Sequence, residues 1–300
     1  KLINERTLED DDAVSNLYMN RGYLFYQLVP IEKNIKGDSI DLEMRMFEGP
    51  QARINKVIIN GNDRLYEKVV RRELRIRPGE LFSKNDLMRS LREIAQTGHF
   101  NPESMQPDVN PNEENGTVDI ALNLESKAND QIEFSLGWGQ TGIIGKLALK
   151  FTNFSIKNLL NPGSYKGLIP QGEGQTFTIS AQTNARYYQA YSVSFLDPWF
   201  GGKRPNSLSV SAYYSRQTGV NSSYYNSNYY NYYNYYGYGS SYGYGSDYYQ
   251  SSIENAYDPN KLLQMAGITL GFGKRLSWPD DWFTLTAELS YNWYSLKNWE

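Results

Sequence analysis

The sequence predicts an α+β domain, preceded by part of a second copy, and then the N-terminal part of an antiparallel transmembrane β-barrel. Two observations support this. Residues up to Glu125 mix helical spacing with strands and turn residues, whereas from Gln131 onward nearly every segment alternates apolar and polar side chains. In addition, Trp and Phe residues stand at the ends of the later segments, which is typical of the two interfaces of a membrane barrel.

The composition agrees with strands rather than helices as membrane spans. The mean hydropathy is −0.63, and no apolar run approaches the roughly twenty residues that a spanning helix requires. A barrel strand needs only about ten alternating residues, so a barrel can be hydrophilic on average. Lys1 does not resemble a natural start and no signal peptide is present, so we expect that processing or truncation removed the beginning.

Charge and cysteine content exclude several functional classes. The net charge is −3 and the 30 Lys and Arg residues are spread along the chain, which argues against nucleic acid as a partner. The absence of cysteine excludes disulfides, zinc–thiolate sites and thiol nucleophiles. The acidic run Asp10–Asp12 lacks the Gly and Glu of a calcium loop, so we interpret it as a helix cap rather than a metal site.

Residues 1–51 are interpreted as the back half of an α+β unit. The expected elements are a helix at Ala13–Met19 that stops at Gly22, and two strands at Tyr23–Pro30 and Ser39–Glu48 joined by a turn at Lys36–Asp38.

Residues 52–127 are interpreted as a complete copy with the order strand, helix, helix, strand, strand. The expected strands are Arg53–Asn60, a weak one at Glu103–Val109 and a strong one at Thr117–Glu125, and the expected helices are Glu67–Leu74 and Lys84–Thr97. Leu87, Leu91 and Ile94 have the spacing of a helical core face.

Short motifs in this copy resemble a POTRA domain, the periplasmic repeat that precedes barrels of the BamA family. They are Val57–Asn62, Arg77–Ser83 and Leu91–Phe100, and the partial copy matches the same template at Leu17–Tyr23 and Phe47–Pro50. The resemblance implies an outer-membrane location with the POTRA domains in the periplasm.

Catalytic and cofactor sites are not expected. His99 is the only histidine; it follows a helix-stopping Gly98 and has no compelling nucleophile near it in sequence, so we interpret it as structural. The sequence contains no nucleotide motif, metal cluster or catalytic pair, so it predicts neither an enzyme nor a cofactor.

Residues 128–300 are expected to form the first seven strands of the barrel. The alternating segments are Gln131–Gly139, Ile143–Phe151, Phe177–Gln182, Ala190–Phe195, Leu208–Tyr214, Ala266–Gly273 and Phe283–Trp293. A soluble sandwich also alternates, but it has no reason to place Trp199, Phe200, Trp278 and Trp282 at strand ends. We therefore expect Trp199, Trp278 and Trp282 at the membrane interface.

Turn lengths agree with this topology. If the POTRA domain is periplasmic, the turns after strands two, four and six face inward, and those after strands four and six are short. The connection after strand five faces outward and is long. This Tyr-rich external loop, 219–257, predicts a surface lid or recognition element. The turn Asp197, Pro198, Trp199, Phe200 resembles the Asx-Pro-aromatic turn after the fourth strand of BamA-type barrels, and Phe151–Asn158 resembles the Bacteroidota branch.

The resemblance implies a mechanism in which a client strand pairs at the barrel seam. The implied barrel has about sixteen strands, so the rest would lie beyond this sequence. The expected pairing strand consists of Gln131, Ile132, Glu133, Phe134, Ser135, Leu136, Gly137, Trp138 and Gly139. Gly137 and Gly139 suit either a loose seam or close packing under a neighbour.

A second docking edge is expected in the POTRA domain. Its residues are Glu103, Ser104, Met105, Gln106, Asp108 and Val109, at the edge of the sheet, with Pro107 limiting the ladder. The implied partners are unfolded outer-membrane β-barrel clients, accessory lipoproteins and the lipid bilayer. Two alternatives stay open: a protein secretion pore of the two-partner type, which also combines POTRA domains with a related barrel, and a passive porin, which the POTRA resemblance disfavours.

Overall fold

The computed structural model describes residues 14–37, 39–139, 142–165, 169–184, 187–218, 261–280 and 282–298. The chain divides into two compact units. The first comprises Lys1–Asn129 and Ser155–Gly174, and the second comprises Asp130–Phe154 and Gln175–Glu300. The chain therefore passes between the units three times, and the segment between two strands of the second unit belongs to the first. Asp10–Asp12 and the Tyr-rich loop 219–257 lie outside the described residues.

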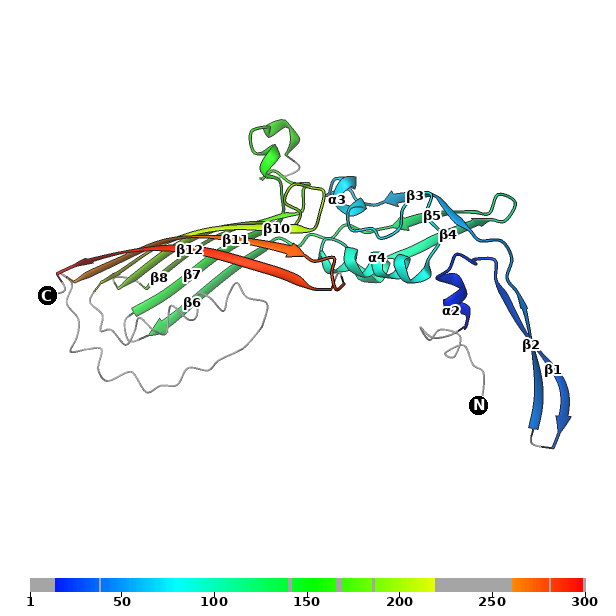
Figure 1. Ribbon diagram of the computed structural model, residues 1–300. Coiled ribbons are helices and arrows are strands. Elements are labelled where there is room, and N and C mark those ends of the chain that lie inside the picture. The colour runs from blue at the N-terminus through cyan, green and yellow to red at the C-terminus, as the bar shows by residue number, and fades with distance from the viewer. Residues whose placement is uncertain are drawn as a thin grey trace. The chain divides into compact units, whose positions relative to one another are not determined.

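The partial copy consists of one helix and one hairpin. Helix α2 (Val14–Met19) is followed by β1 (Gln27–Lys36) and β2 (Ser39–Phe47), which form an antiparallel two-stranded sheet (Figure 1). The strand expected to start at Tyr23 begins only at Gln27, because Gly22 at φ +90° starts a turn that stacks Tyr26 on Tyr18 with ring centroids 4.8 Å apart. The same strand continues beyond Pro30.

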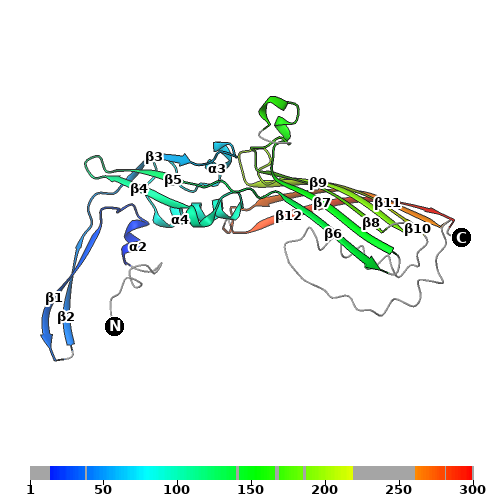
Figure 2. The same cartoon turned by 180° about the vertical axis from the view of Figure 1, so that it is seen from behind.

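The second copy is an α+β unit with a three-stranded sheet. Its elements are β3 (Arg53–Asn60), α3 (Glu67–Arg71), α4 (Lys84–Gln96), η1 (Pro102–Ser104), β4 (Gln106–Asn112) and β5 (Thr117–Asn123). The sheet order is β3-β5-β4, with β5 parallel to β3 and antiparallel to β4 (Figure 2). The predicted order of elements is confirmed, although the first helix is shorter than expected and ends at Arg71 rather than Leu74.

One part of the predicted edge strand is wrong. Glu103 and Ser104 lie in the 3₁₀-helix η1, because Pro102 starts the turn and the side chain of Asn101 accepts a hydrogen bond from the Glu103 N–H at 3.3 Å. Met105 follows in an irregular conformation, so the strand begins at Gln106.

The core of this unit lies between the sheet and the helices. Val118, Ile120 and Leu122 of β5 are all 0% exposed and alternate with partly exposed residues. Helix α4 buries Leu87, Leu91 and Ile94, as the spacing predicts, and the Ser83 hydroxyl caps it by accepting from the Asp86 N–H at 3.2 Å. The alternating apolar residues of β5 and the regularly spaced apolar residues of α4 therefore pack in one cluster.

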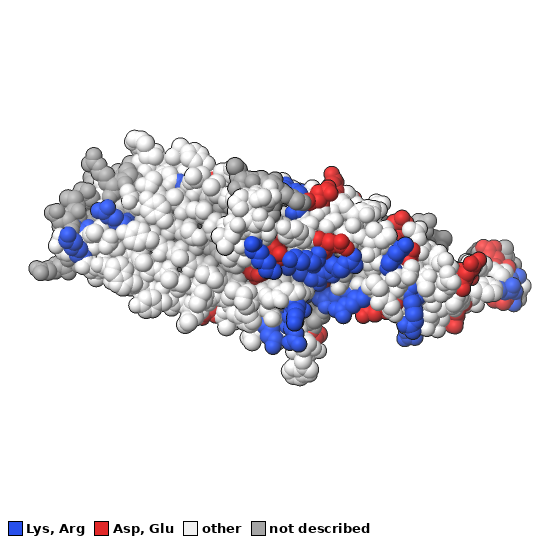
Figure 3. All heavy atoms as spheres, turned by 90° about the horizontal axis from the view of Figure 1, so that it is seen from above, with Lys and Arg blue, Asp and Glu red and all other residues white. Residues whose placement is uncertain are grey.

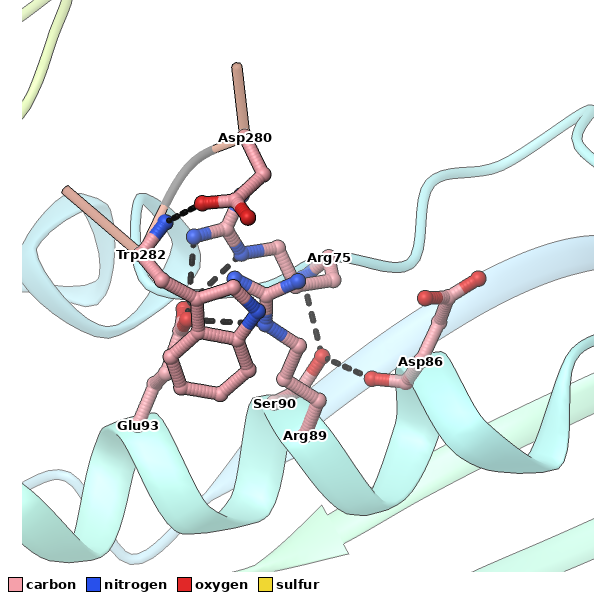
Figure 4. A network of polar contacts seen from close by, with 7 residues as sticks. All are labelled: Arg75, Asp86, Arg89, Ser90, Glu93, Asp280 and Trp282. Atoms are coloured by element: carbon pink, nitrogen blue, oxygen red, sulfur yellow. Dashed lines mark hydrogen bonds and ion pairs between the residues drawn. The ribbon is translucent and has the colours of Figure 1, made fainter. Parts of the chain in front are cut away.

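Polar contacts attach the segment after α3 to α4 (Figure 4). The Arg75 guanidinium donates two hydrogen bonds to the Glu93 carboxylate, each 2.9 Å long, and the Arg75 N–H donates to the Ser90 hydroxyl at 2.8 Å. Arg89 also donates to Glu93 at 3.2 Å. A bidentate Arg–carboxylate pair fixes the relative orientation of its two side chains. The network therefore holds the non-helical segment that contains Leu74 and Ile76, and both residues pack in the core.

The second unit is a seven-stranded antiparallel sheet in which strands follow one another in sequence order. Its strands are β6 (Gln131–Gly139), β7 (Gly142–Phe154), β8 (Gln175–Asn184), β9 (Tyr188–Asp197), β10 (Asn206–Thr218), β11 (Leu262–Arg275) and β12 (Thr284–Lys297). All seven predicted strands are present. No helix among the described residues is long and apolar enough to cross a membrane.

The register aligns apolar residues across all seven strands on one face. One continuous row, read from β6 to β12 through directly opposite partners, is Ile132, Leu149, Ile179, Val193, Ala212, Ile268 and Tyr291. A row of the opposite face is Glu133, Ala148, Ser180, Ser192, Tyr213, Gly267 and Asn292. The apolar face is exposed, with Ile132 at 77% and Leu289 at 71%, which is the sidedness of a barrel wall in lipid.

Candidate functional site

Strand β6 is one end of the seven-stranded sheet. It pairs with β7 from Gln131, opposite Lys150, to Gly139, opposite Gly142, and Lys146 of β7 forms an ion pair with Glu133 at 3.3 Å. Among the described residues, the other backbone edge of β6 has no strand beside it. The side chains of Ile132, Phe134, Leu136 and Trp138 are 77%, 69%, 63% and 83% exposed. The strand expected to pair with clients is therefore an edge strand with an exposed apolar face.

The two ends of β6 differ in how they are held. At its start, the Asp130 carboxylate accepts a hydrogen bond from the Thr152 N–H of β7 at 3.0 Å, which fixes the register. Near its far end, a Cβ placed on Gly137 would have no heavy atom within 4 Å. Among the described residues, close packing against a neighbour therefore does not require a glycine at position 137.

Strand β4 forms one edge of the POTRA-like sheet. Val109 packs against the core, whereas Gln106 and Asp108 are exposed. Pro107 and Pro111 have no N–H groups, so they limit the number of hydrogen bonds that an added strand could accept from this edge.

The turn after β9 is built around the Asp197 carboxylate. One oxygen accepts from the Trp199 N–H at 2.9 Å, and the other accepts from the Gln175 side chain at 3.0 Å. Phe200 closes the turn by donating its N–H to the Asn206 carbonyl at 2.7 Å. Pro198 lies between these anchored residues, so the motif forms a rigid short turn.

The aromatic residues expected at the membrane interface lie in turns. Trp278 and Trp282, in the connection between β11 and β12, are 82% and 74% exposed, and Trp199 is half-buried. The Trp282 N–H donates to the Asp280 carboxylate at 2.9 Å, which orders its backbone (Figure 4).

The structure also assembles a set of residues that sequence reasoning missed. In the segment Ser155–Gly174, between β7 and β8, the Glu173 carboxylate is 2.5 Å from the Lys68 ammonium, and the Gly172 carbonyl accepts from the Tyr66 N–H at 2.9 Å. The Asn158 side chain donates to the Tyr66 hydroxyl at 2.6 Å. This segment is therefore docked on the residues around α3.

Two glycines make that docking close. Gly172 has φ +124°, and a Cβ there would lie 2.7 Å from the Tyr66 ring. Gly174 has φ +68°, and a Cβ there would lie 3.2 Å from Val69 and 3.5 Å from His99 Nε2. The Gly172–Glu173–Gly174 sequence is a signal that could have indicated this docking, because glycines adopt positive φ easily and allow close backbone approach.

The remaining candidates from the sequence are His99 and possible metal ligands. His99 is 6% exposed, and its carbonyl accepts from the Lys127 N–H at 2.8 Å. Among the described residues, no group of three or more His, Cys, Asp or Glu side chains could hold a metal ion.

Two families match the chain. The POTRA family, described as a surface antigen variable number repeat, matches residues 52–127, and the Omp85 superfamily domain matches residues 171–298. The chain therefore contains a segment similar to the POTRA repeat, followed by a segment similar to the Omp85 superfamily domain. The predicted resemblance to the BamA family is confirmed by its relatives, and so is the fold class of POTRA repeats followed by part of a barrel.

Two relatives and one solved structure illustrate the similarity. The outer membrane protein assembly factor BamA of Nitratidesulfovibrio vulgaris is 25% identical over 183 residues, covering 59% of this chain and 22% of the relative. The protein of the same name from Neisseria meningitidis serogroup B is 25% identical over 215 residues, covering 69% and 26%. The crystal structure of BamA from Haemophilus ducreyi lacking POTRA domains 1–3 has the same fold, with 16% identity and a TM-score of 0.65, over 99% of this chain and 46% of that one.

The BamA relatives and the POTRA match also indicate the location. BamA homologues are outer-membrane proteins with periplasmic POTRA domains, so the predicted outer-membrane location is confirmed. The chain spans about a quarter or less of the length of the curated relatives it matches, at 21%, 22% and 26%.

Proposed function

We propose that this protein folds β-barrel clients and inserts them into the outer membrane, with the terminal strand of the client pairing along β6. The observation that carries this proposal is the position of β6 at the end of a sheet whose apolar face is exposed. The relatives named as outer membrane protein assembly factors support the same activity.

The physical reason lies in the cost of unpaired backbone groups in lipid. Each N–H or C=O without a partner there costs several kcal/mol, so a barrel seam opens only if another strand replaces the lost pairing. An incoming strand adds main-chain hydrogen bonds regardless of its exact sequence, which suits a factor with many clients. The free energy for insertion then comes from folding of the client rather than from hydrolysis.

The anchored start of β6 suits this role. Because Asp130 holds the Thr152 N–H, β6 keeps its register on β7 while its other edge receives a client. Gly137, with open space around it, lets the far end of the strand adjust without displacing a packed side chain.

A second docking edge is proposed at β4 of the POTRA domain, for client strands or accessory lipoproteins. Its place at one end of the order β3-β5-β4 and the exposed Gln106 and Asp108 support this. Pro107 and Pro111 would restrict an added strand to few hydrogen bonds, which favours weak and reversible docking.

Cysteine crosslinking tests the pairing at β6. Since the chain contains no cysteine, Ser135→Cys on β6 is compared with Ser194→Cys on β9, whose two edges are both paired. We expect a stalled client with one cysteine in its terminal strand to crosslink at position 135 and not at 194. Equal crosslinking at both positions, or none at 135 while the client accumulates, contradicts the pairing.

Depletion tests the assembly activity itself. If the full-length protein is depleted, we expect the amounts of many outer-membrane barrels to fall together in a quantitative proteome. Unchanged barrels with loss of one secreted protein would instead assign a secretion pore of the two-partner type.

A further inference from the structure

The segment Ser155–Gly174 has one polar end fixed to the POTRA domain and one apolar end exposed. Its fixed end is buried, with Gln171 at 9% and Glu173 at 7% exposed. Its other end, Ile156–Leu160, exposes Ile156 at 49%, Leu159 at 50% and Leu160 at 93%. We propose that Ile156, Leu159 and Leu160 insert into the periplasmic leaflet of the outer membrane and anchor the POTRA domain to the phospholipid surface.

In this end of the segment, the amide side chain is hydrogen-bonded to the protein while the aliphatic side chains are exposed. The amide residue, Asn158, points into the protein, where its side chain donates to the Tyr66 hydroxyl at 2.6 Å and to the Gln171 carbonyl at 3.3 Å. The aliphatic residues on both sides of it, Ile156, Leu159 and Leu160, are about half exposed or more. Large exposed aliphatic side chains gathered around one half-buried, hydrogen-bonded amide indicate an apolar medium outside.

The backbone of this end is suited to the membrane boundary. Residues Ile156–Asn158 form the 3₁₀-helix η2. The Leu159 N–H donates to the Ile156 carbonyl at 3.2 Å, and the Asn161 N–H donates to the Asn158 carbonyl at 2.9 Å. Local hydrogen bonds of this kind lower the cost of bringing a turn into the headgroup region.

Chain continuity places this segment at the correct membrane boundary. The start of β6, entered from the POTRA domain, is opposite the end of β7, with Gln131 paired to Lys150. Because POTRA domains of BamA homologues lie in the periplasm, β7 ends at the periplasmic boundary, and Ser155 follows its last residue directly.

The apolar face of the sheet extends to the last residue of β7, Phe154. A register shift between Phe151 and Phe154 lets the Phe154 ring stack on Phe177, with centroids 5.0 Å apart, and meet Phe195 at 6.3 Å. Phe177 and Phe195 are directly opposite each other on the apolar face. The exposed leucines thus follow, in the chain, a strand end that already belongs to the lipid-facing surface.

Charge in the segment agrees with a phospholipid occupant. The Lys157 side chain is 71% exposed, and its ammonium is 3.9 Å from the Glu173 carboxylate. A lysine beside inserted aliphatic residues can extend its charge to headgroup phosphates while its stem stays among acyl chains. The two contacts that hold the opposite end, Lys68 to Glu173 and Tyr66 to Gly172, would transmit this anchoring to the POTRA domain.

Spin labelling in vesicles tests the proposal independently of assembly activity. Leu160→Cys is introduced into the full-length protein, after any cysteine elsewhere is replaced by serine, and a nitroxide is attached. The protein is reconstituted in vesicles of phosphatidylethanolamine and phosphatidylglycerol. Leu289→Cys, on the apolar face of β12, is the lipid control, and Glu114→Cys, in an exposed POTRA turn, is the water control.

The readout is the ratio of accessibility to oxygen, which concentrates in lipid, over accessibility to a water-soluble nickel chelate. We expect the ratio at position 160 to be several-fold above that at 114 and to approach that at 289. A ratio equal to the water control overturns the proposal. Low accessibility to both reagents also overturns it, because it would show that protein covers the segment. A label at Leu159→Cys repeats the test at a less exposed position.

Discussion

Strands β5 and β12 have the same alternation in sequence and opposite surroundings in the structure. In β5, the apolar residues Val118, Ile120 and Leu122 are completely buried under the helices of the POTRA domain. In β12, Leu285, Leu289 and Tyr291 are 61%, 71% and 71% exposed. Alternation alone therefore predicts a strand with two unlike faces, but not the medium that the apolar face contacts.

Other features of the chain decide that medium. The first unit supplies α3 and α4 to cover its sheet, and its charged residues cover the outside, whereas the visible surface over the seven-stranded sheet is nearly free of charge (Figure 3). With no helical cover among the described residues and exposed Trp in its turns, the large sheet matches a lipid-facing wall. We therefore predict that a charged substitution is tolerated on the solvent-facing side of β5 and on the side of β12 opposite its apolar face.

The largest expected effect is that of Ile120→Asp in β5. The new carboxylate would be buried without a partner, which we expect to lower the free energy of unfolding of the POTRA domain by about 4 kcal/mol. Pulse proteolysis in urea measures this loss. Asn123→Asp, at an exposed position of the same strand, should change it by less than about 0.5 kcal/mol. Equal losses in both variants would remove the distinction between the faces of β5.

A smaller effect is expected from Leu289→Arg in β12. A cation on the lipid-facing side of a barrel strand costs about 2 kcal/mol or more, whereas Ser290→Arg on the opposite face should cost less than about 1 kcal/mol. Tryptophan fluorescence during urea titration in vesicles can follow this unfolding, since all six Trp residues of the chain lie in the second unit. If Ser290→Arg were the more harmful variant, the two faces would have to be exchanged.

The smallest expected effect concerns acid sensitivity of the POTRA sheet. The Asn55 side chain donates to the Asp119 carboxylate at 2.7 Å, and with Lys56 at 3.2 Å it lowers the pKa of Asp119. A lowered folded-state pKa stabilises the fold above the unfolded pKa of about 3.9 and loses this contribution as the pH falls through the folded value.

The test of this effect compares stability at two pH values. Asp119→Asn removes the titrating group, so pulse proteolysis should show a smaller loss of stability between neutral pH and about pH 3 than in the parent protein. An unchanged pH dependence would assign the acid sensitivity to other carboxylates.

Much of the fold follows from local patterns in the sequence. Period-two alternation predicts all seven strands of the large sheet, because each strand pairs with its neighbour in sequence and needs no distant information. The helix α4 follows from Leu87, Leu91 and Ile94. Local turns are harder to predict. Asn101 and Pro102 start a 3₁₀-helix that includes Glu103 and Ser104. The turn that begins at Gly22 places the start of β1 at Gln27 instead of Tyr23.

The candidate site was predictable in part. Gln131–Gly139 was identified as a strand from alternation alone, and its structure agrees, while its role as a pairing edge stays a prediction. The docking of Ser155–Gly174 could not be predicted, because Lys68 and Glu173 are separated by 105 residues. Nothing in either local sequence specifies the other as its partner.

This docking has a consequence for experiments that cut the chain at the family boundary. A soluble piece limited to residues 52–127 would lack Gly172 and Glu173, so Tyr66 and Val69 would lose the neighbours that cover them in the intact protein. In such a piece, a partly apolar surface that Gly172 and Glu173 cover in the intact protein would be exposed to water. Peptides captured by that surface would report on the excision rather than on the natural partners of the domain.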